Sequence, residues 1–190
     1  IIYKNLDGLQ MADMRWITFF SQTGSEIADL SEEMGRWPDI IITNERPEHL
    51  RTIDPRIEKQ GYFTWANKPT EEDYIELLEA NPNAIVTLHG WLRIVPEYVC
   101  ERSKIYNGHP GLITKYPELK GKDPQIRAFQ GKYKTAGAVL HKVSGGVDEG
   151  KVILSREFKT AGLDLDDFFR ILRDKALEMW YILLKNLLQP

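Results

Sequence analysis

Three side chains that can serve acyl transfer lie in two glycine-containing segments of the chain. Asn107 and His109 flank Gly108, and Asp148 lies in the segment 145–150. An amide can donate a hydrogen bond to a developing oxyanion, an imidazole can carry a proton near neutral pH, and a carboxylate can orient that imidazole. Glycine is common where another group must approach the backbone closely. We therefore predict Asn107, His109 and Asp148 as catalytic residues.

Each of these residues also has an ordinary structural interpretation. Aspartate is frequent in turns, so Asp148 taken alone is a hairpin residue, and His109 taken alone is a loop histidine. Their joint occurrence with Asn107 favours the catalytic interpretation. Of the other histidines, we expect His141 to lie inside a strand with a satisfied hydrogen bond, and His89 to cover the binding cleft.

The chain offers no evident nucleophile of its own. Cys100, the single cysteine, lies in a helix-like segment without a glycine turn, and the pattern Gly-x-Ser-x-Gly does not occur. We infer that the attacking group belongs to a substrate. One cysteine excludes an internal disulfide and a cysteine cluster for a metal, so we expect no metal and a reducing cytoplasm.

Length and charge limit the class of protein. The 190 residues are 42% apolar and carry a formal net charge of −3. We expect a single catalytic domain over residues 1–190. The charge does not favour long nucleic acid or an anionic membrane, and no apolar run approaches the roughly 20 residues of a membrane span. The first residues show no secretory pattern.

Strand-like and helix-like segments alternate along the chain. The expected strands cover 15–20, 39–43, 84–88, 105–106, 135–143 and 151–158, and a further extended segment covers 62–65. The expected helices follow residue 25, cover 55–59, begin at the Thr70–Asp73 capping box, cover 96–101 and 124–129, and end with a long helix capped by Asp164. The inner stripe of that last helix is Phe168, Leu172, Ala176, Met179 and Leu183.

Repeated strand–helix units predict a Rossmann-like α/β fold. We expect a mostly parallel sheet with helices on both faces, an antiparallel hairpin near the C-terminus and a long C-terminal helix. Ligands bind such sheets beyond the carboxyl ends of the strands. Segments 21–25, 89–91 and 107–109 each follow a strand, so we expect them to meet at one cleft.

The segment between the first strand and its helix is a candidate anion site. Free N–H groups at a helix N-terminus favour a phosphate there. The alternative is a plain turn in which Thr23 or Ser25 caps the helix. We expect the substrate to contact five residues around this part of the cleft: Thr23, Gly24, Ser25, Gly108 and Pro110.

Another part of the cleft is expected to be apolar. Trp91, Leu92, Ile94 and Val95 offer apolar surface, although segment 91–94 could also be core with one surface charge. Glycines in segment 145–146 leave backbone groups free to meet a flat heterocycle. The first strand is not followed by Gly-x-Gly-x-x-Gly, so the sequence does not predict a nicotinamide dinucleotide site.

The order and spacing of these motifs resemble the folate-dependent formyltransferases. That family includes the glycinamide ribonucleotide, methionyl-tRNA and sugar formyltransferases. The resemblance rests on segments 107–110, 115–117, 148–150 and 90–96 and on the spacing between His141 and Asp148. It runs from about Trp16 to Val152.

The resemblance implies a formyltransferase fold and 10-formyltetrahydrofolate as the donor cosubstrate. Asn107 would hold the formyl oxygen as it becomes an oxyanion, His109 would move protons between the amine and the folate nitrogen, and Asp148 would hold the imidazole. The residues implied around the folate are Trp91, Leu92, Arg93, Ile94, Val95, Ser144, Gly145, Gly146 and Val147.

The acceptor implied by the resemblance is the primary amine of a small metabolite, such as a phosphorylated sugar or nucleotide. Glu26 stands where the glycinamide ribonucleotide enzymes usually have an amide, so a phosphate nearby would require this carboxylate to point away. Lys120, Lys122 and Arg127 are candidate charge partners. The end of the chain at Pro190, without a second domain, and the acidic charge balance argue against methionyl-tRNA as the acceptor.

Several alternatives stay open. The chain could be a glycinamide ribonucleotide formyltransferase, or a formyltetrahydrofolate deformylase in which water replaces the amine. A catalytically silent folate-binding module is disfavoured by the presence of all three predicted catalytic residues. Trp180 and Tyr181 in the last helix either form a homodimer contact or complete the core.

Overall fold

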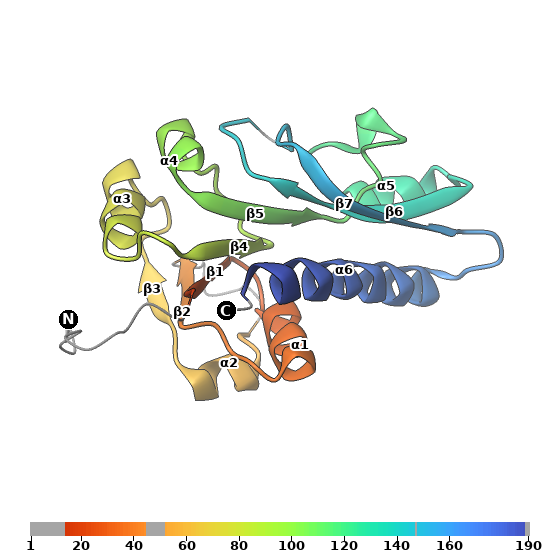
Figure 1. Ribbon diagram of the computed structural model, residues 1–190. Helices are drawn as coiled ribbons and strands as arrows, with labels where there is room; N and C mark the ends of the chain where they lie inside the picture. Colours follow the sequence, from red (N-terminus) through yellow and green to blue (C-terminus); the bar gives the residue numbers. More distant parts are fainter. Residues whose placement is uncertain (1–13, 45–51, 147, 189–190) are drawn as a thin grey trace.

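The computed structural model describes residues 14–44, 52–146 and 148–188 and arranges them around a seven-stranded sheet (Figure 1). The strands are β1 (Trp16–Phe20), β2 (Ile40–Asn44), β3 (Phe63–Trp65), β4 (Ile85–His89), β5 (Lys104–His109), β6 (Thr135–Lys142) and β7 (Val152–Lys159). Their spatial order is β3-β2-β1-β4-β5-β6-β7. Strands β1 to β5 are parallel to one another, and β6 runs antiparallel to both of its neighbours, β5 and β7. The predicted fold class is confirmed, including the antiparallel hairpin.

Helices cover both faces of this sheet. They are α1 (Ser25–Met34), α2 (Pro55–Gln60), α3 (Glu71–Glu79), α4 (Glu97–Arg102), α5 (Pro124–Gln130) and α6 (Leu165–Leu187), and a 3-10 turn, η1 (Pro117–Leu119), precedes α5. In Figure 1, α3 and α4 lie on one side of the sheet, and α1, α2 and α6 lie on the other.

The central strand β1 shows why both faces must be covered. Side chains alternate between the two faces of a strand. Trp16 packs in one apolar cluster with Phe168 of α6, whereas Ile17 packs in another with Tyr74 of α3 and Val99 of α4. Trp16 and Ile17 are both fully buried. A strand that is apolar on both faces therefore requires helices on both faces.

The starts of two helices test the capping predictions. Thr70 and Asp73 form the predicted capping box of α3. At α1 the N-cap is Gly24 in the left-handed conformation, with no side-chain cap, so the alternative of a Thr23 or Ser25 cap is wrong. The hydroxyl of Thr23 donates to that of Ser25 at 3.1 Å and accepts a hydrogen bond from the backbone N–H of Ser25 at 3.3 Å.

Strand β5 is longer than its apolar core suggested. The sequence pattern predicted a strand only over 105–106, with Asn107 at its tip. In the structure the strand continues to His109, because antiparallel β6 pairs Asn107 with His141 and His109 with Val139. Pairing across the sheet thus extends the strand through polar residues that have low strand propensity.

The long helix α6 is capped by Asp164 and packs on β6 and β7. Of its predicted inner stripe, Ala176 is only partly buried and faces the cleft described below. Trp180 is 0% exposed and Tyr181 packs partly buried against the same apolar cluster. In this chain the two aromatic residues therefore complete the core.

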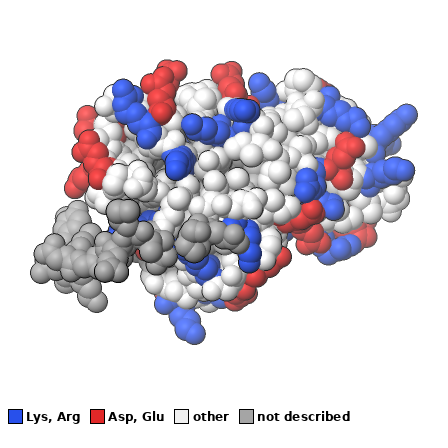
Figure 2. All heavy atoms as spheres, in the orientation of Figure 1, with Lys and Arg blue, Asp and Glu red and all other residues white. Residues whose placement is uncertain are grey.

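The surface carries no dominant sign of charge on the face that Figure 2 shows. Blue and red side chains are interspersed over it, in keeping with the small net charge. Within residues 14–44, 52–146 and 148–188, none of the helices is both long enough and apolar enough to pass through a membrane.

Candidate active site

A cleft of about 1090 Å³ opens beyond the carboxyl ends of the parallel strands. Its walls come from the loop after β1, the segment after β4, the end of β5, segment 121–126, β6 and α6. Strand β1 lies between β2 and β4 in the sheet. The chain continues from β1 to β2 on one side and from β4 to β5 on the other, so the loops after β1 and β4 diverge and leave a crevice between them. Segments 21–25, 89–91 and 107–109 all contribute to the cleft, as the sequence led us to expect.

His109 is held at both ring nitrogens. Its Nδ1 lies 3.2 Å from Oδ2 of Asp148, and its Nε2 lies 2.9 Å from the carbonyl oxygen of Leu119. A neutral imidazole has one N–H, so it can donate to only one of these two oxygens at a time. The ring therefore sits between two proton acceptors, in a buried position at the cleft.

Asn107 and Asp148 meet at a second histidine. Nδ2 of Asn107 lies 3.2 Å from Nε2 of His141, and the same Nε2 lies 3.5 Å from Oδ1 of Asp148. A ring nitrogen without a hydrogen accepts from the amide, and one with a hydrogen donates to the carboxylate. The Asn107 amide carries two hydrogens, so one stays available to the cleft when His141 takes the other.

Asp148 is the charged centre of this cluster. Burial would raise the pKa of its carboxyl group, but hydrogen bonds with His109, His141 and the backbone N–H of Gly121 outweigh burial and hold the pKa far below its ordinary range. The residue has a φ of 52°, in the left-handed region that aspartate tolerates better than most residues. The carboxylate is therefore ionised at neutral pH and fixed between two imidazoles.

The expected apolar slot lies along the segment after β4. All of Trp91, Leu92, Arg93, Ile94 and Val95 line the cleft. Leu92 and Ile94 are 59% and 65% exposed, so they present open apolar surface. Trp91 and Val95 are buried and support that surface, and Trp91 donates a hydrogen bond to the Tyr74 hydroxyl.

Segment 144–147 was also expected to contact the donor, and only part of it lines the cleft. Ser144 and Gly146 line the cleft, whereas Gly145 packs against Glu97 and does not line it. Val147 and the N-terminal residues 1–13 lie outside the described residues. Arg93 does not extend freely into the cleft, because its guanidinium donates to Oδ1 and to the backbone oxygen of Asn67.

The five residues expected around the substrate all line the cleft. They are Thr23, Gly24, Ser25, Gly108 and Pro110. Of the three proposed charge partners, Lys122 lines the cleft and Lys120 does not. Arg127 donates to the carbonyl oxygens of Glu118, Lys120 and Lys122, so its guanidinium holds segment 118–122 in place rather than facing a ligand.

The sequence did not reveal a second charged cluster on the cleft wall. Oε1 of Glu26 lies 2.6 Å from Nδ1 of His89 and accepts a hydrogen bond of 3.1 Å from the Trp180 indole. Nε2 of His89 contacts Thr87 Oγ1 at 2.9 Å. Glu26 lies in the first turn of the helix after β1, and His89 ends strand β4, so the sequence showed only that each follows or ends a strand. The structure shows that these two strands are neighbours.

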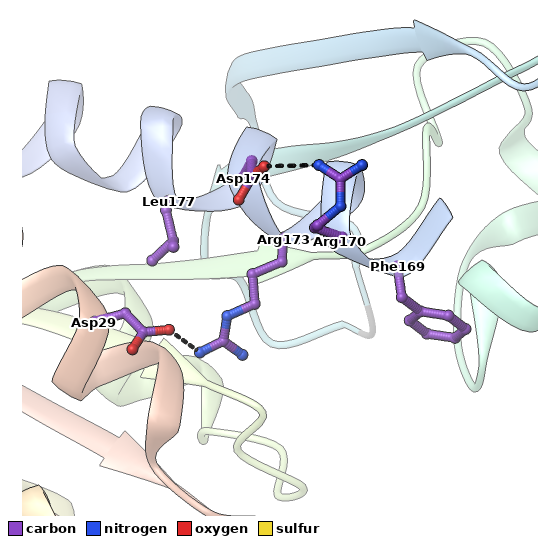
Figure 3. Close-up of a pocket in the computed structure, with 6 residues that line it drawn as sticks. All are labelled: Asp29, Phe169, Arg170, Arg173, Asp174 and Leu177. Carbon is purple, nitrogen blue, oxygen red and sulfur yellow. Dashed lines mark hydrogen bonds and ion pairs between the residues drawn. The ribbon is translucent and has the colours of Figure 1, made fainter. Parts of the chain in front are cut away.

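Arg173 of α6 closes the side of the cleft next to α1. Figure 3 shows its side chain directed toward Asp29, which it contacts at 2.5 Å, while Arg170 turns toward Asp174. Arg173 also donates to the Ser25 hydroxyl at 3.2 Å. Its charge is therefore largely matched by a carboxylate of α1.

The cluster chemistry suits proton transfer and oxyanion stabilisation. It joins an amide donor, two imidazoles and one carboxylate in a chain of direct contacts that runs from Asn107 through His141 and Asp148 to His109. In the described part of the chain, no group of three or more His, Cys, Asp or Glu side chains is arranged to hold a metal ion. Such a set can stabilise charge on an oxygen and carry protons at an acyl centre.

Comparison with known proteins gives a consistent family match. The model of the formyl transferase family matches residues 43–176. The phosphoribosylglycinamide formyltransferase of Bacillus subtilis (strain 168) is 28% identical over 113 residues, which cover 58% of this chain and 56% of that protein. The formyltetrahydrofolate deformylase of the same organism is 28% identical over 138 residues, which cover 70% of this chain and 42% of that protein. The chain thus spans about half of the length of these curated relatives, or less.

Solved structures show the same fold. The phosphoribosylglycinamide formyltransferase from Campylobacter jejuni superposes with a TM-score of 0.75 at 20% identity, covering 91% of this chain and 96% of that one. The enzyme of the same name from Streptococcus pneumoniae TIGR4 gives a TM-score of 0.74 at 23% identity, covering 92% and 98%. At this level of identity the likeness concerns the fold.

Proposed function

This chain belongs to the formyl transferase family, and we propose that it transfers a formyl group from 10-formyltetrahydrofolate to the primary amine of a small metabolite. The observation that carries the proposal is the contact cluster of Asn107, His109, His141 and Asp148 on the wall of a large cleft. We further infer that the chain forms one catalytic domain, because a single sheet runs through its described residues.

Three residues of the cluster, Asn107, His109 and Asp148, have roles in this reaction. When the amine nitrogen attacks the formyl carbon, the free Nδ2 hydrogen of Asn107 donates to the oxygen that becomes negative. His109 takes the proton that the nitrogen loses and returns it to the nitrogen from which the formyl carbon departs. Asp148 keeps the imidazole oriented and stabilises its charged form. Proton transfer requires a substrate nitrogen to replace one of the two acceptors now facing His109.

The exposed apolar slot fits the donor. Leu92 and Ile94 offer open apolar surface in the cleft that Ser144 and Gly146 also line, and backbone groups at Ser144 and Gly146 can meet a flat heterocycle. The bound donor supplies the formyl group. The protein would hold its ring system against residues 91–95 and direct the reacting end toward Asn107.

A phosphorylated sugar or nucleotide is the acceptor class that we favour. Lys122 lines the cleft, is exposed, and forms none of the ion pairs found among the described residues. It can therefore meet an anionic group on a ligand. The N-terminal turn of α1, whose Thr23 and Ser25 line the cleft, would face another part of the same ligand.

A screen of amine metabolites tests the proposal. The purified chain is incubated with 10-formyltetrahydrofolate and single amines, including glycinamide ribonucleotide and amino sugars with and without phosphate. Mass spectrometry then measures the gain of one formyl group on the amine. We expect donor-dependent formylation of at least one amine. Formylation of glycinamide ribonucleotide alone would select the narrower alternative within the family.

A deformylase is the second candidate, and the match to the Bacillus subtilis deformylase over 70% of this chain favours considering it. In that reaction water takes the place of the amine. Release of formate and tetrahydrofolate at the same rate with and without an amine would support this candidate. Donor binding without turnover under any condition would instead indicate a binding module.

A further inference from the structure

Ser21, the residue after β1, holds the segment that follows β4. Its backbone N–H donates to the carbonyl oxygen of Gly90 at 3.2 Å, and its hydroxyl oxygen accepts from the backbone N–H of Leu92 at 3.0 Å. Ser21 is 4% exposed and lines the cleft. Gly90 has a φ of 63°, in the left-handed region, so the chain turns away from the direction of β4 at this residue. The two hydrogen bonds therefore span the turn through which the chain enters segment 91–95.

Segment 91–95 carries both buried and open apolar side chains. Trp91 and Val95 are buried, whereas Leu92 and Ile94 are exposed, and all four line the cleft. Apolar side chains gain free energy when they leave water, so an unrestrained segment would turn Leu92 and Ile94 inward. Keeping these two side chains open to a ligand therefore requires a backbone that is fixed from outside the segment.

The backbone of Leu92 is fixed on both sides. The Ser21 hydroxyl holds its N–H, and the guanidinium of Arg93 donates to its carbonyl oxygen at 2.6 Å. The same guanidinium also donates to Oδ1 of Asn67, which follows β3. The two peptide groups that flank the Leu92 side chain are thus tied to the ends of two other strands. Turning this side chain inward would break at least one of these hydrogen bonds.

The segment that Ser21 holds lies on the same face of the sheet as the proposed reaction centre. Trp91 packs against Phe19, with ring centroids 5.2 Å apart. Phe19 is paired with Leu88 across the sheet, and Leu88 is paired with Asn107. Directly paired residues on neighbouring strands turn their side chains to the same face. Segment 91–95 therefore packs on the face toward which Asn107 points.

We propose that Ser21 is a positioning residue for the donor, and that its hydroxyl holds the Leu92 backbone so that Leu92 and Ile94 stay open to the donor's ring system. This inference rests on the proposed function and specifies what prepares its apolar slot. A slot that is formed before binding spares the ligand the free-energy cost of ordering a loop. Because Ser21 acts through the backbone of Leu92, its loss should weaken donor binding and leave the chemistry at Asn107 and His109 unchanged.

The test compares Ser21→Ala with Ser31→Ala. Ser31 is also buried, but its hydroxyl donates to the Ile27 carbonyl oxygen within its own helix, so this variant controls for the loss of a buried hydroxyl. Calorimetry measures the Kd of a reduced folate with a non-hydrolysable formyl group, and kinetics with the amine found in the screen gives kcat and the KM of that amine. In Ser21→Ala we expect Kd to rise at least about fivefold, the scale of one hydrogen bond. We expect kcat and the KM of the amine to change by less than about twofold. Ser31→Ala should match the wild type in all three quantities.

An unchanged Kd in folded Ser21→Ala, a loss confined to kcat, or an equal rise of Kd in Ser31→Ala overturns this inference, while formylation by the wild type leaves the proposed function standing. A wild type that binds no reduced folate overturns both. If Ser21→Ala does not fold, amide hydrogen exchange measured by NMR on the wild type decides. The Leu92 N–H should already be protected without the folate, and protection that appears only when the folate binds overturns the inference.

Discussion

His109 is the residue whose removal should affect the reaction most directly. Its ring touches Asp148 and the Leu119 carbonyl, so its contribution is chemical rather than a matter of core packing. We expect His109→Ala to fold and to lower kcat by at least about a hundredfold, the usual scale for a positioned acid–base group. Steady-state kinetics with circular dichroism as the folding control checks this. A folded variant with near-normal turnover would remove His109 from the mechanism.

Asn107 should act on the transition state rather than on donor binding. One Nδ2 hydrogen is engaged by His141 when that ring nitrogen accepts, and the other is free for the oxyanion. Loss of such a donor typically costs about 3 kcal/mol of transition-state stabilisation. We expect Asn107→Ala to lower kcat accordingly and to leave donor affinity, measured by titration, close to that of the wild type. Lost donor binding with unaffected chemistry would assign Asn107 to binding instead.

Asp148 links the site to stability. Its pKa is lowered on folding, so its ionised form stabilises the folded chain fully above the ordinary value of 3.8, and this contribution is lost as the pH falls toward the lower folded pKa. We expect Asp148→Asn to reduce the free energy of unfolding at pH 7, and the difference from wild type to shrink below about pH 3.8. Denaturant titrations at several pH values measure this. A difference that stays constant down to pH 3 would contradict the assignment.

Asp148 lies in the loop that connects β6 to β7, so the backbone path of this loop decides where its carboxylate lies. A Cβ at Gly150 would collide with the carbonyl oxygen of Lys142, which is backbone and cannot turn aside. We expect Gly150→Ala to shift this connection and lower kcat/KM at least about tenfold, since displacements of about 1 Å can cost more than that.

The neighbouring exposed Lys151 offers the matched control, because only its side chain is truncated at an exposed position. Lys151→Ala should stay within about twofold of wild-type kcat/KM, as expected for a surface substitution. Equal activity of Gly150→Ala and Lys151→Ala would show that the connection tolerates the added methyl group.

For the whole molecule, the cleft should distinguish folates from dinucleotides. The exposed apolar side chains of Leu92 and Ile94 line the same cleft as Asn107 and His109, whereas the loop after β1 contains Gly24 as its one glycine. A ligand that binds the folded state raises the melting temperature. We expect a reduced folate with a non-hydrolysable formyl group to raise it and NAD to leave it unchanged, as measured by calorimetry. Tight dinucleotide binding without folate binding would overturn the proposed function.

The sequence by itself was sufficient for the order of elements and for most of the candidate site. The continuous apolar runs of β1, β2 and β4 and the capping residues Thr70 and Asp164 act locally, so their consequences can be predicted from neighbours in the chain. Ligands bind such sheets beyond the carboxyl ends of the strands, and parallel strands end at the same edge of the sheet. The loops that follow these strands could therefore be predicted to meet around one cleft.

Only the tertiary structure decided which side chains touch. The length of β5 depends on its pairing with β6, and the contacts of His141 with Asn107 and Asp148 depend on the register of that pair. The contact of Glu26 with His89 and Trp180 joins three elements that lie far apart in the chain. Local propensities carry no information about such register and packing, because these contacts depend on side chains that approach one another only in the assembled fold.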